Sequence, residues 1–296
     1  GEQARQIFAE VRDRAGEGRA LNRIANIAYE EGRLADAEQI FVEALEIWRD
    51  IGHASGFAQA LNNIADTRLM QGRLASARPL FEQALASAEG SGDTQKAGLI
   101  LANLSELRGR QGDLAAAREL GEQAARQLRL IGYVYGLHAA LSALGAAALD
   151  GGDLGAAEEH YAEALACSRE IPDPRLVGYS LHGTGDTWLQ RGNLAEARRA
   201  FEEAAATRRA IGCPVDAAES ELSLASLALQ ERRVSEARAL VAGALATFRA
   251  SRMDEMAAKA EAIELLVAVE ERAVSEAQTA ALEQKLGSLE NAAFRL

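Results

Sequence analysis

The chain has few cysteines, few prolines, few aromatic residues and no excess of basic charge. Its 296 residues include two cysteines, four prolines and 5% aromatic residues, and the formal net charge is -12. Cys167 and Cys213 lie far apart with no CxxC pair, which excludes a disulfide framework and a thiolate zinc site. The acidic balance disfavours direct binding to nucleic acid. We therefore expect a protein of a reducing compartment, with a cytoplasmic location.

A strongly apolar run is also missing. The longest uncharged stretch near the middle, residues 130–149, contains His138 and is diluted by Gly, Ala and Ser, so we expect no membrane span. The first five residues include no Met and no basic-then-apolar signal pattern. They resemble a tag remnant or a cut inside a longer chain, so we expect the sequence to be a fragment.

A 40-residue period organises the chain. Abundant Ala, Leu, Glu, Arg and Gln favour helices nearly throughout, and residues recur in register from one unit to the next. The glycine column holds Gly32, Gly72, Gly112, Gly152 and Gly192, followed by Arg232 and Arg272. Five places later stand Ala37, Ala77, Ala117, Ala157, Ala197, Ala237 and Ala277. Nine places after the glycine stand Phe41, Phe81, Gly121, Tyr161, Phe201, Val241 and Ala281.

The residues before each glycine form a helical stripe. Leu21, Ile24 and Ala25 stand three and four places apart, and the next copies repeat them. Each unit is therefore predicted to be one helix, a tight turn at the glycine and a second helix. The glycine supplies the left-handed backbone that ends the first helix. The small residues are expected where the two helices cross.

These columns carry a family resemblance. The order Leu61, Ile64, Ala65, Gly72, Ala77, Phe81, Ala84 resembles the tetratricopeptide (TPR) signature of large and small positions. The longer, 40-residue unit is similar to the repeats of animal spindle-orientation adaptors, Rap-type peptide-receptor regulators and MalT-like sensor regions. The resemblance implies an all-α, right-handed TPR superhelix (α-solenoid) of about seven helix-turn-helix repeats plus a leading helix.

The period sets the predicted boundaries of the repeats. One domain over 1–296 is expected, in which 1–17 is the second helix of a truncated repeat. The full repeats are predicted at 18–57, 58–97, 98–137, 138–177, 178–217, 218–257 and 258–296. The columns blur beyond residue 250, as a final capping repeat would show.

The resemblance also implies where a ligand would bind. The first helix of each unit would line a concave channel, and its second, fifth, sixth, ninth and thirteenth places would face a ligand. Candidates at these places are Asn22, Asn26, Gln59, Asn62, Asn63, Asp66, Asn103, Glu106, Arg110, Ser142, Tyr179, His182 and Asp186.

Five of these candidates are asparagines of the first three units. An amide offers donors and an acceptor that suit the backbone of an extended peptide, although the same amides could lie on a solvated face or bond across neighbouring helices. The channel charges are mixed, and a cluster of Lys and Arg that grips a terminal carboxylate is missing. A neutral or basic segment is therefore the expected partner, rather than an acidic one.

The sequence supports neither a metal site nor an active site. The four histidines form no HxxxH or HExxH pattern, and a solvated pair is the favoured interpretation of His182 and Asp186. We expect no enzyme and no cofactor. The favoured hypothesis is a protein- or peptide-binding sensor or scaffold region of a larger bacterial regulatory protein, with a neighbouring domain as a possible partner. Two alternatives remain. One is a small-molecule sensor with a pocket near Tyr179, His182 and Trp188, and the other is a self-assembly scaffold.

Overall fold

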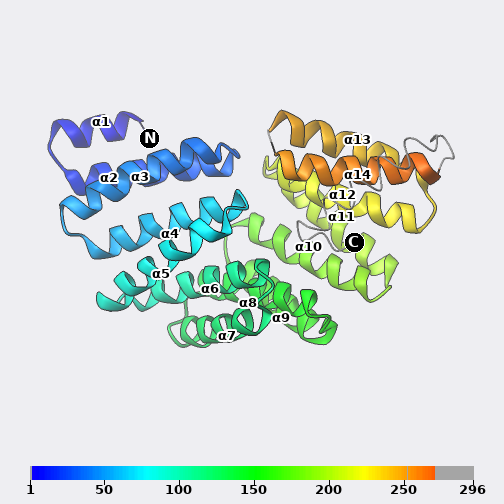
Figure 1. Cartoon of the computed structure of the whole chain (residues 1–296), viewed down its shortest axis with the longest axis horizontal. Helices are drawn as coiled ribbons and strands as arrows, with labels where there is room; N and C mark the ends of the chain where they lie inside the picture. The colour runs from blue at the N-terminus through cyan, green and yellow to red at the C-terminus, as the bar shows by residue number, and fades with distance from the viewer. Residues whose placement is uncertain (1, 252, 271–296) are drawn as a thin grey trace. The chain divides into compact units, whose positions relative to one another are not determined.

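The fold is entirely helical in the part of the chain that the structure describes. The computed structural model describes residues 2–251 and 253–270, which hold fourteen helices and no strand (Figure 1). The all-α fold predicted from the composition is confirmed. None of these helices combines the length and the apolar character that a bilayer span requires.

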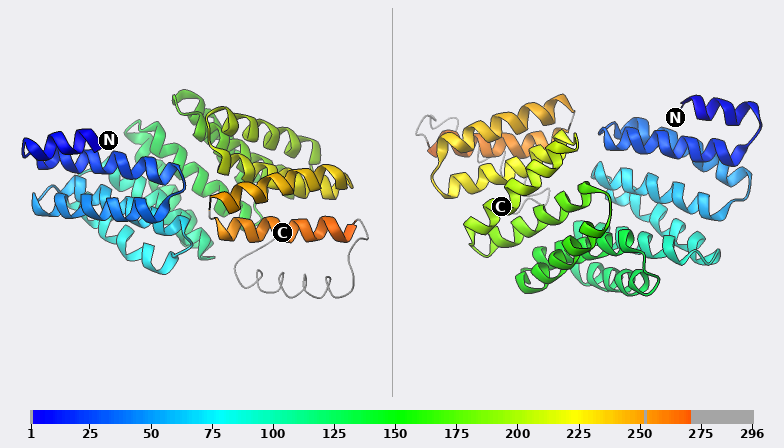
Figure 2. Two further views of the ribbon diagram at one scale, coloured as in Figure 1. Left: turned by 90° about the horizontal axis from the view of Figure 1, so that it is seen from above. Right: turned by 180° about the vertical axis from the view of Figure 1, so that it is seen from behind.

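The residues group into two compact units, Gly1–Leu176 and Val177–Leu296. In the first unit, each helix packs against the next one along the chain (Figures 1 and 2). Its helices are α1 (Glu2–Glu10), α2 (Arg14–Glu30), α3 (Leu34–Asp50), α4 (Ala54–Met70), α5 (Leu74–Gly90), α6 (Thr94–Arg110), α7 (Leu114–Leu130), α8 (Val134–Asp150) and α9 (Leu154–Glu170).

The second unit holds most of α10 and the helices after it. Successive helices from α11 to α14 also pack against each other (Figure 2). The bounds are α10 (Pro174–Gln190), α11 (Leu194–Ala210), α12 (Pro214–Gln230), α13 (Val234–Ala250) and α14 (Asp254–Glu270). The first helices of the hairpins, called A helices below, are α2, α4, α6, α8, α10, α12 and α14, and the second helices are called B helices.

A half-period of 20 residues underlies the 40-residue repeat. From α2 to α14 every helix has 17 residues and every connection has three. The middle residue of the connection is left-handed, as at Gly32 with φ 75° and Gly52 with φ 67°. The residue after it donates its backbone N–H to a carbonyl five residues earlier, as from Arg33 to Ala28 at 2.8 Å. This bond satisfies a carbonyl at the end of the helix, so the turn within a hairpin and the turn between hairpins have the same chemistry.

One connection departs from this chemistry. Pro172 stands where the other turns place a left-handed residue, and its ring fixes φ at a negative value. Ile171 is extended instead, with φ -100° and ψ 134°. The departure falls just before the boundary between the two units at residues 176 and 177.

The repeated columns form the core, as the spacing predicts. The alanine column from Ala37 to Ala237 is fully buried, and the aromatic rings of Phe41, Phe81 and Phe201 are at most 1% exposed. Small residues leave room for the rings: a Cβ at Gly185 would lie 2.6 Å from the ring of Phe201. Each ring thus fills the space that a glycine or alanine leaves on a neighbouring helix.

The observed helices shift the predicted boundaries. The A helices begin at residues 14, 54 and 94, four residues before the unit boundaries at 18, 58 and 98, because the cap lies next to the left-handed residue. The leading helix α1 ends at Glu10. The last unit, 258–296, is described only to residue 270, so its capping role lies mostly outside the described residues. The single domain expected over residues 1–296 remains a prediction.

Arg232 provides a test of the turn. It has φ 57° where the five preceding repeats have glycine, and a left-handed non-glycine residue is strained. Arg232→Gly should therefore increase the free energy of unfolding by about 0.5–1 kcal/mol, after the entropy that glycine gains in the unfolded state is deducted. Denaturant unfolding measures the change. Gly72→Arg, at a turn where a Cβ would meet nothing within 4 Å, should have the opposite effect. A less stable Arg232→Gly would contradict the strain argument.

Candidate functional site

The A helices of the first unit carry most of the predicted binding residues. Because the helices repeat every 40 residues, these side chains stand at equivalent places in successive hairpins. α2 carries Asn22 and Asn26; α4 carries Gln59, Asn62, Asn63 and Asp66; α6 carries Asn103, Glu106 and Arg110; and α8 carries Ser142.

Several of the amides bond to each other. The Asn103 side chain donates to Oδ1 of Asn62 over 2.9 Å and so links α6 to α4. Asn62 is only 5% exposed. Within α4, the Gln59 amide donates to Oδ1 of Asn63 over 2.8 Å. At Asn62 and Asn103 the structure thus has the bond across neighbouring helices that the sequence left as an alternative to ligand contact.

Two predicted residues hold polar atoms without a hydrogen-bond partner. Oδ1 of Asn22 and Oγ of Ser142 are both buried and unpaired. Asn26, one turn after Asn22, is exposed. Buried polar atoms are rarely left unpaired in folded proteins. The A-helix face of this unit therefore has hydrogen-bonding capacity that the protein itself does not use.

Asp66 is the most perturbed of the predicted residues. Burial raises the pKa of its carboxyl to about 6, and the negative charge of Glu106 adds to the rise. A hydrogen bond with Tyr29 and the positive charge of Arg110 oppose it. The Arg110 guanidinium pairs with Glu106 at 2.8 Å on the same helix. A cation from a ligand would favour the ionised form of Asp66.

The sequence missed Tyr29 and Arg175, which each contact a residue of another repeat in the first unit. Tyr29, on α2, is the hydrogen-bond partner of Asp66 on α4. Arg175 pairs with Asp173 at 2.8 Å and with Glu30, and all three lie in the first unit. The Arg175 guanidinium holds the pKa of the Asp173 carboxyl below its usual value. No periodic signal reveals the contacts of Tyr29 with Asp66 and of Arg175 with Glu30, because they join different places of different repeats.

The three predicted residues of the second unit lie on α10 and contact its neighbours. His182 pairs with Asp186 at 3.5 Å, and its Nδ1 lies 3.2 Å from Oγ of Ser220 on α12. The Tyr179 ring is 45% exposed and covers the guanidinium of Arg208 at 5.0 Å. Trp188 packs instead into the core cluster around Phe201. His182 is thus held by two helices and is not a solvated member of a simple pair.

Among the described residues, no three His, Cys, Asp or Glu side chains are grouped as metal ligands would be. Cys167 and Cys213 are both reduced and partly buried. Burial raises the pKa of the Cys167 thiol, and the charges of Glu163 and Glu170 add to the rise. This thiol is therefore a weak nucleophile near neutral pH.

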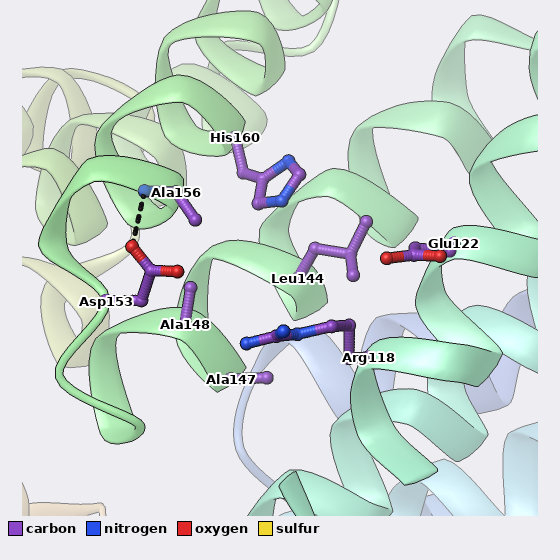
Figure 3. A pocket seen from close by; sticks show the side chains of 8 residues that line it. All are labelled: Arg118, Glu122, Leu144, Ala147, Ala148, Asp153, Ala156 and His160. Atoms are coloured by element: carbon purple, nitrogen blue, oxygen red, sulfur yellow. Dashed lines mark hydrogen bonds between the residues drawn. The ribbon is translucent and has the colours of Figure 1, made fainter. Parts of the chain in front are cut away.

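A pocket that the sequence did not predict lies among α7, α8 and α9 (Figure 3). It has a volume of about 150 Å³. Figure 3 shows Leu144 among the polar side chains of Arg118, Glu122 and His160. Burial lowers the pKa of His160. The lining residues are Arg118, Glu122, Leu144, Ala147, Ala148, Asp153, Ala156 and His160.

Gly121 gives the physical reason for the different packing here. It occupies the column where α5 has Phe81 and α9 has Tyr161. The Cγ and Cδ2 atoms of Leu144 lie 2.8 Å from the point where a Cβ of Gly121 would stand. Leu144 thus fills the space of the missing ring, and α6 packs closely against α8. The broken column was visible in the sequence, and it was the signal that could have located this pocket.

Sequence families agree with this architecture. The model of the family described as tetratricopeptide repeat matches residues 56–129 and 136–210. Two further models of the same description match residues 18–51 and 183–252. The chain belongs to the tetratricopeptide repeat family. The resemblance expected from the columns is confirmed.

Solved TPR structures share the fold at low sequence identity. A STAND ATPase with a TPR sensor from Pyrococcus horikoshii is 18% identical, with a TM-score of 0.65 over 86% of this chain and 38% of that one. A Rap protein complexed with competence and sporulation factor is 14% identical, with a TM-score of 0.70 over 93% and 87%. NprR in complex with its cognate peptide NprX is 11% identical, with a TM-score of 0.68 over 97% and 84%.

These similarities establish the TPR fold and no more. The chain spans about two fifths of the STAND protein, whose other parts it does not match. Among curated proteins, none has a sequence that matches this chain.

The raised pKa of Asp66 predicts a pH dependence of stability. Because the pKa is higher in the folded state than the value of 3.8 for an unperturbed Asp, ionisation of Asp66 destabilises the folded protein as the pH rises from about 4 to above 6. Asp66→Asn should therefore gain stability relative to the wild type over this range. Denaturant unfolding at several pH values measures it. Asp36→Asn, which removes an exposed carboxyl of α3, is the control, and an equal pH profile for both variants would contradict the assignment.

A second prediction tests the packing at Gly121. Gly121→Ala places a methyl group 2.8 Å from Leu144 and 2.9 Å from Oγ of Ser105, so it should destabilise the protein by about 1–3 kcal/mol. Adding Leu144→Ala should make the two changes non-additive, because the smaller side chain removes part of the clash. Thermal and denaturant unfolding of the single and double variants measure the coupling. Additive effects would show that Leu144 does not fill this space.

Proposed function

We propose that this TPR array captures a protein or peptide segment along the A-helix face of its first unit. The observation that carries the proposal is the run of polar side chains at equivalent places of α2, α4 and α6, which includes exposed Asn26 and unpaired Oδ1 of Asn22. Repeat proteins use such extended faces for binding. NprR, a structure with the same fold, holds a peptide, which supports the same use here.

The charge of the face supports a neutral or basic ligand. Asp66 and Glu106 lie close enough for the charge of Glu106 to raise the pKa of Asp66, and Arg110 already pairs with Glu106. A ligand cation beside Asp66 would relieve the repulsion between the two carboxyls, whereas an acidic ligand would increase it. Asn22, Asn26 and Ser142 would then bond to the ligand backbone.

In the cell we propose a sensor or scaffold role within a larger, cytoplasmic, bacterial regulatory protein, without catalysis or a cofactor of its own. The STAND protein with a TPR sensor provides the precedent for such an arrangement. A neighbouring domain of the full-length protein would then respond to the captured segment. The net charge of -12 supports the exclusion of nucleic acid as a direct partner.

The proposal predicts both a charge preference and its location. In a library of peptides of equal length, basic and neutral peptides should bind more tightly than acidic ones. Asp66→Asn should weaken the binding of a basic peptide by about 3- to 10-fold, because it removes a charge-assisted contact. Fluorescence anisotropy with labelled peptides measures both effects.

A matched control separates this site from the general negative charge of the protein. Glu119→Gln removes one exposed carboxylate from the B helix α7 and changes the net charge by the same amount as Asp66→Asn. It should leave the affinity unchanged. Equal losses in both variants, or tighter binding of acidic peptides, would refute the proposed site.

A further inference from the structure

Arg208 is a buried charge at a place that other repeats fill with apolar or small residues. It stands near the end of the B helix α11 and is 1% exposed. The same place in the other hairpins holds Trp48, Ala88, Leu128, Ser168 and Phe248, all buried. A guanidinium in this column loses its hydration, which is costly unless protein groups replace the water.

The protein replaces only part of that hydration. Nη1 of Arg208 donates to the backbone oxygen of Asp216 over 2.8 Å and to Oγ of Ser220 over 2.7 Å. The nearest carboxylate oxygen, of Glu219, lies 3.5 Å from Nη1, and the Glu219 side chain is 40% exposed. Nε and Nη2 are buried and have no hydrogen-bond partner. The charge is therefore poorly compensated.

The two unpaired nitrogens lie on one edge of the guanidinium. Nε–H and one Nη2–H point in parallel, and this edge matches the two oxygens of a carboxylate in a bidentate pair. Neither backbone carbonyl nor hydroxyl oxygens occupy it here. The unused edge thus has the geometry and the charge of a carboxylate receptor.

Two neighbouring residues of α10 determine access to Arg208. A Cβ at Gly178 would lie 2.8 Å from Cγ and 3.2 Å from Nε of Arg208, so the absence of a side chain leaves room for the arginine. The Tyr179 ring covers the guanidinium at 5.0 Å from Cζ and is itself 45% exposed. Tyr179 is therefore an exposed side chain that lies against the buried guanidinium.

We propose that Arg208 is an anion site in which Nε and Nη2 bind a ligand carboxylate once the Tyr179 ring moves aside. The carboxylate can belong to a small organic acid or to the C-terminus of a peptide. This site lies in the second unit. It goes beyond the proposed peptide-binding face of the first unit and does not depend on it.

Acetate is the probe for this site, and neutral acetamide of nearly the same shape is its control. In the ¹⁵N-labelled full chain, the Nε–H resonance of Arg208, identified by its loss in Arg208→Leu, should shift saturably with acetate at constant ionic strength. Acetamide should leave it unchanged. Absence of a saturable shift with acetate, or an equal shift with acetamide, would overturn the proposal.

Variants distinguish binding at this edge from general screening by salt. Arg208→Leu, which introduces the residue found at Leu128, should melt at an equal or higher temperature without acetate, because a buried charge gives way to an apolar side chain. Acetate, by binding the folded state, should raise the melting temperature of the wild type at constant ionic strength and should not raise that of Arg208→Leu. Arg209→Leu, at the exposed neighbour that pairs with Glu221, should keep the wild-type response. Loss of the response in Arg209→Leu, or its retention in Arg208→Leu, would overturn the assignment.

Further experiments test whether Tyr179 covers the site and which kind of ligand supplies the carboxylate. Tyr179→Ala should bind acetate at least as tightly as the wild type, and a loss of binding would refute the role of Tyr179 as a cover. N-acetyl-trialanine with a free C-terminus should bind, and its amide should not. Tighter binding of this peptide than of acetate would identify a peptide terminus as the ligand, and equal binding a small acid. Binding of the amide would overturn the proposal. The peptide-library test of the first unit can fail without changing these results.

Discussion

The left-handed residue at the centre of most three-residue connections determines the rest of the architecture. It ends a helix of fixed length and lets the next backbone N–H bond to a carbonyl five residues earlier. Since each helix and connection together take 20 residues, equivalent side chains recur every 40. The polar face of α2, α4 and α6 is thus a consequence of the turns, because a longer connection in one hairpin would shift all later side chains out of register.

The same register determines how closely neighbouring A helices approach. A ring from the B helix, such as Phe81 or Phe201, packs against small or aliphatic residues of the A helices beside it. Where Gly121 removes the ring, Leu144 takes its place and α6 packs closely against α8. One substitution in the aromatic column therefore changes the local packing of a hairpin and is accompanied by a pocket beside it. An array of equal repeats gains distinct surfaces in this way.

The columns made the fold predictable because they are local and repeated. The spacing of Gly72, Ala77 and Phe81 predicts a turn, a close helix crossing and a buried aromatic ring within one hairpin. The repetition of this spacing along the chain makes the prediction robust to single departures. The A helices start four residues before the predicted repeat boundaries, because the spacing of the motif says nothing about the residue that caps a helix. The bond between Asn62 and Asn103 joins different places of two repeats, so it depends on how far apart α4 and α6 lie, and no repeat pattern contains that distance.

The sequence did not reveal the burial of Arg208, because its column does not repeat one type of residue. Its column varies from Trp48 to Ala88, so no pattern marked the place as buried, and an arginine near a helix end is ordinary on a surface. The structure shows that the variable column is fully buried. Large residues fit there because glycines face them: Gly18 and Gly56 face Trp48, and Gly178 faces Arg208.

The polar atoms of the array divide into two groups with different consequences. Asn62 and Asn103 satisfy each other, so they hold two A helices together and offer less to a ligand. Asn22, Ser142 and Arg208 retain buried atoms without partners, and each such atom lowers the stability of the fold. A uniformly packed array would replace such groups with apolar side chains, as most copies of the Arg208 column do. Buried polar groups that remain unpaired despite their cost in stability are therefore the best candidates for binding a ligand from outside the chain.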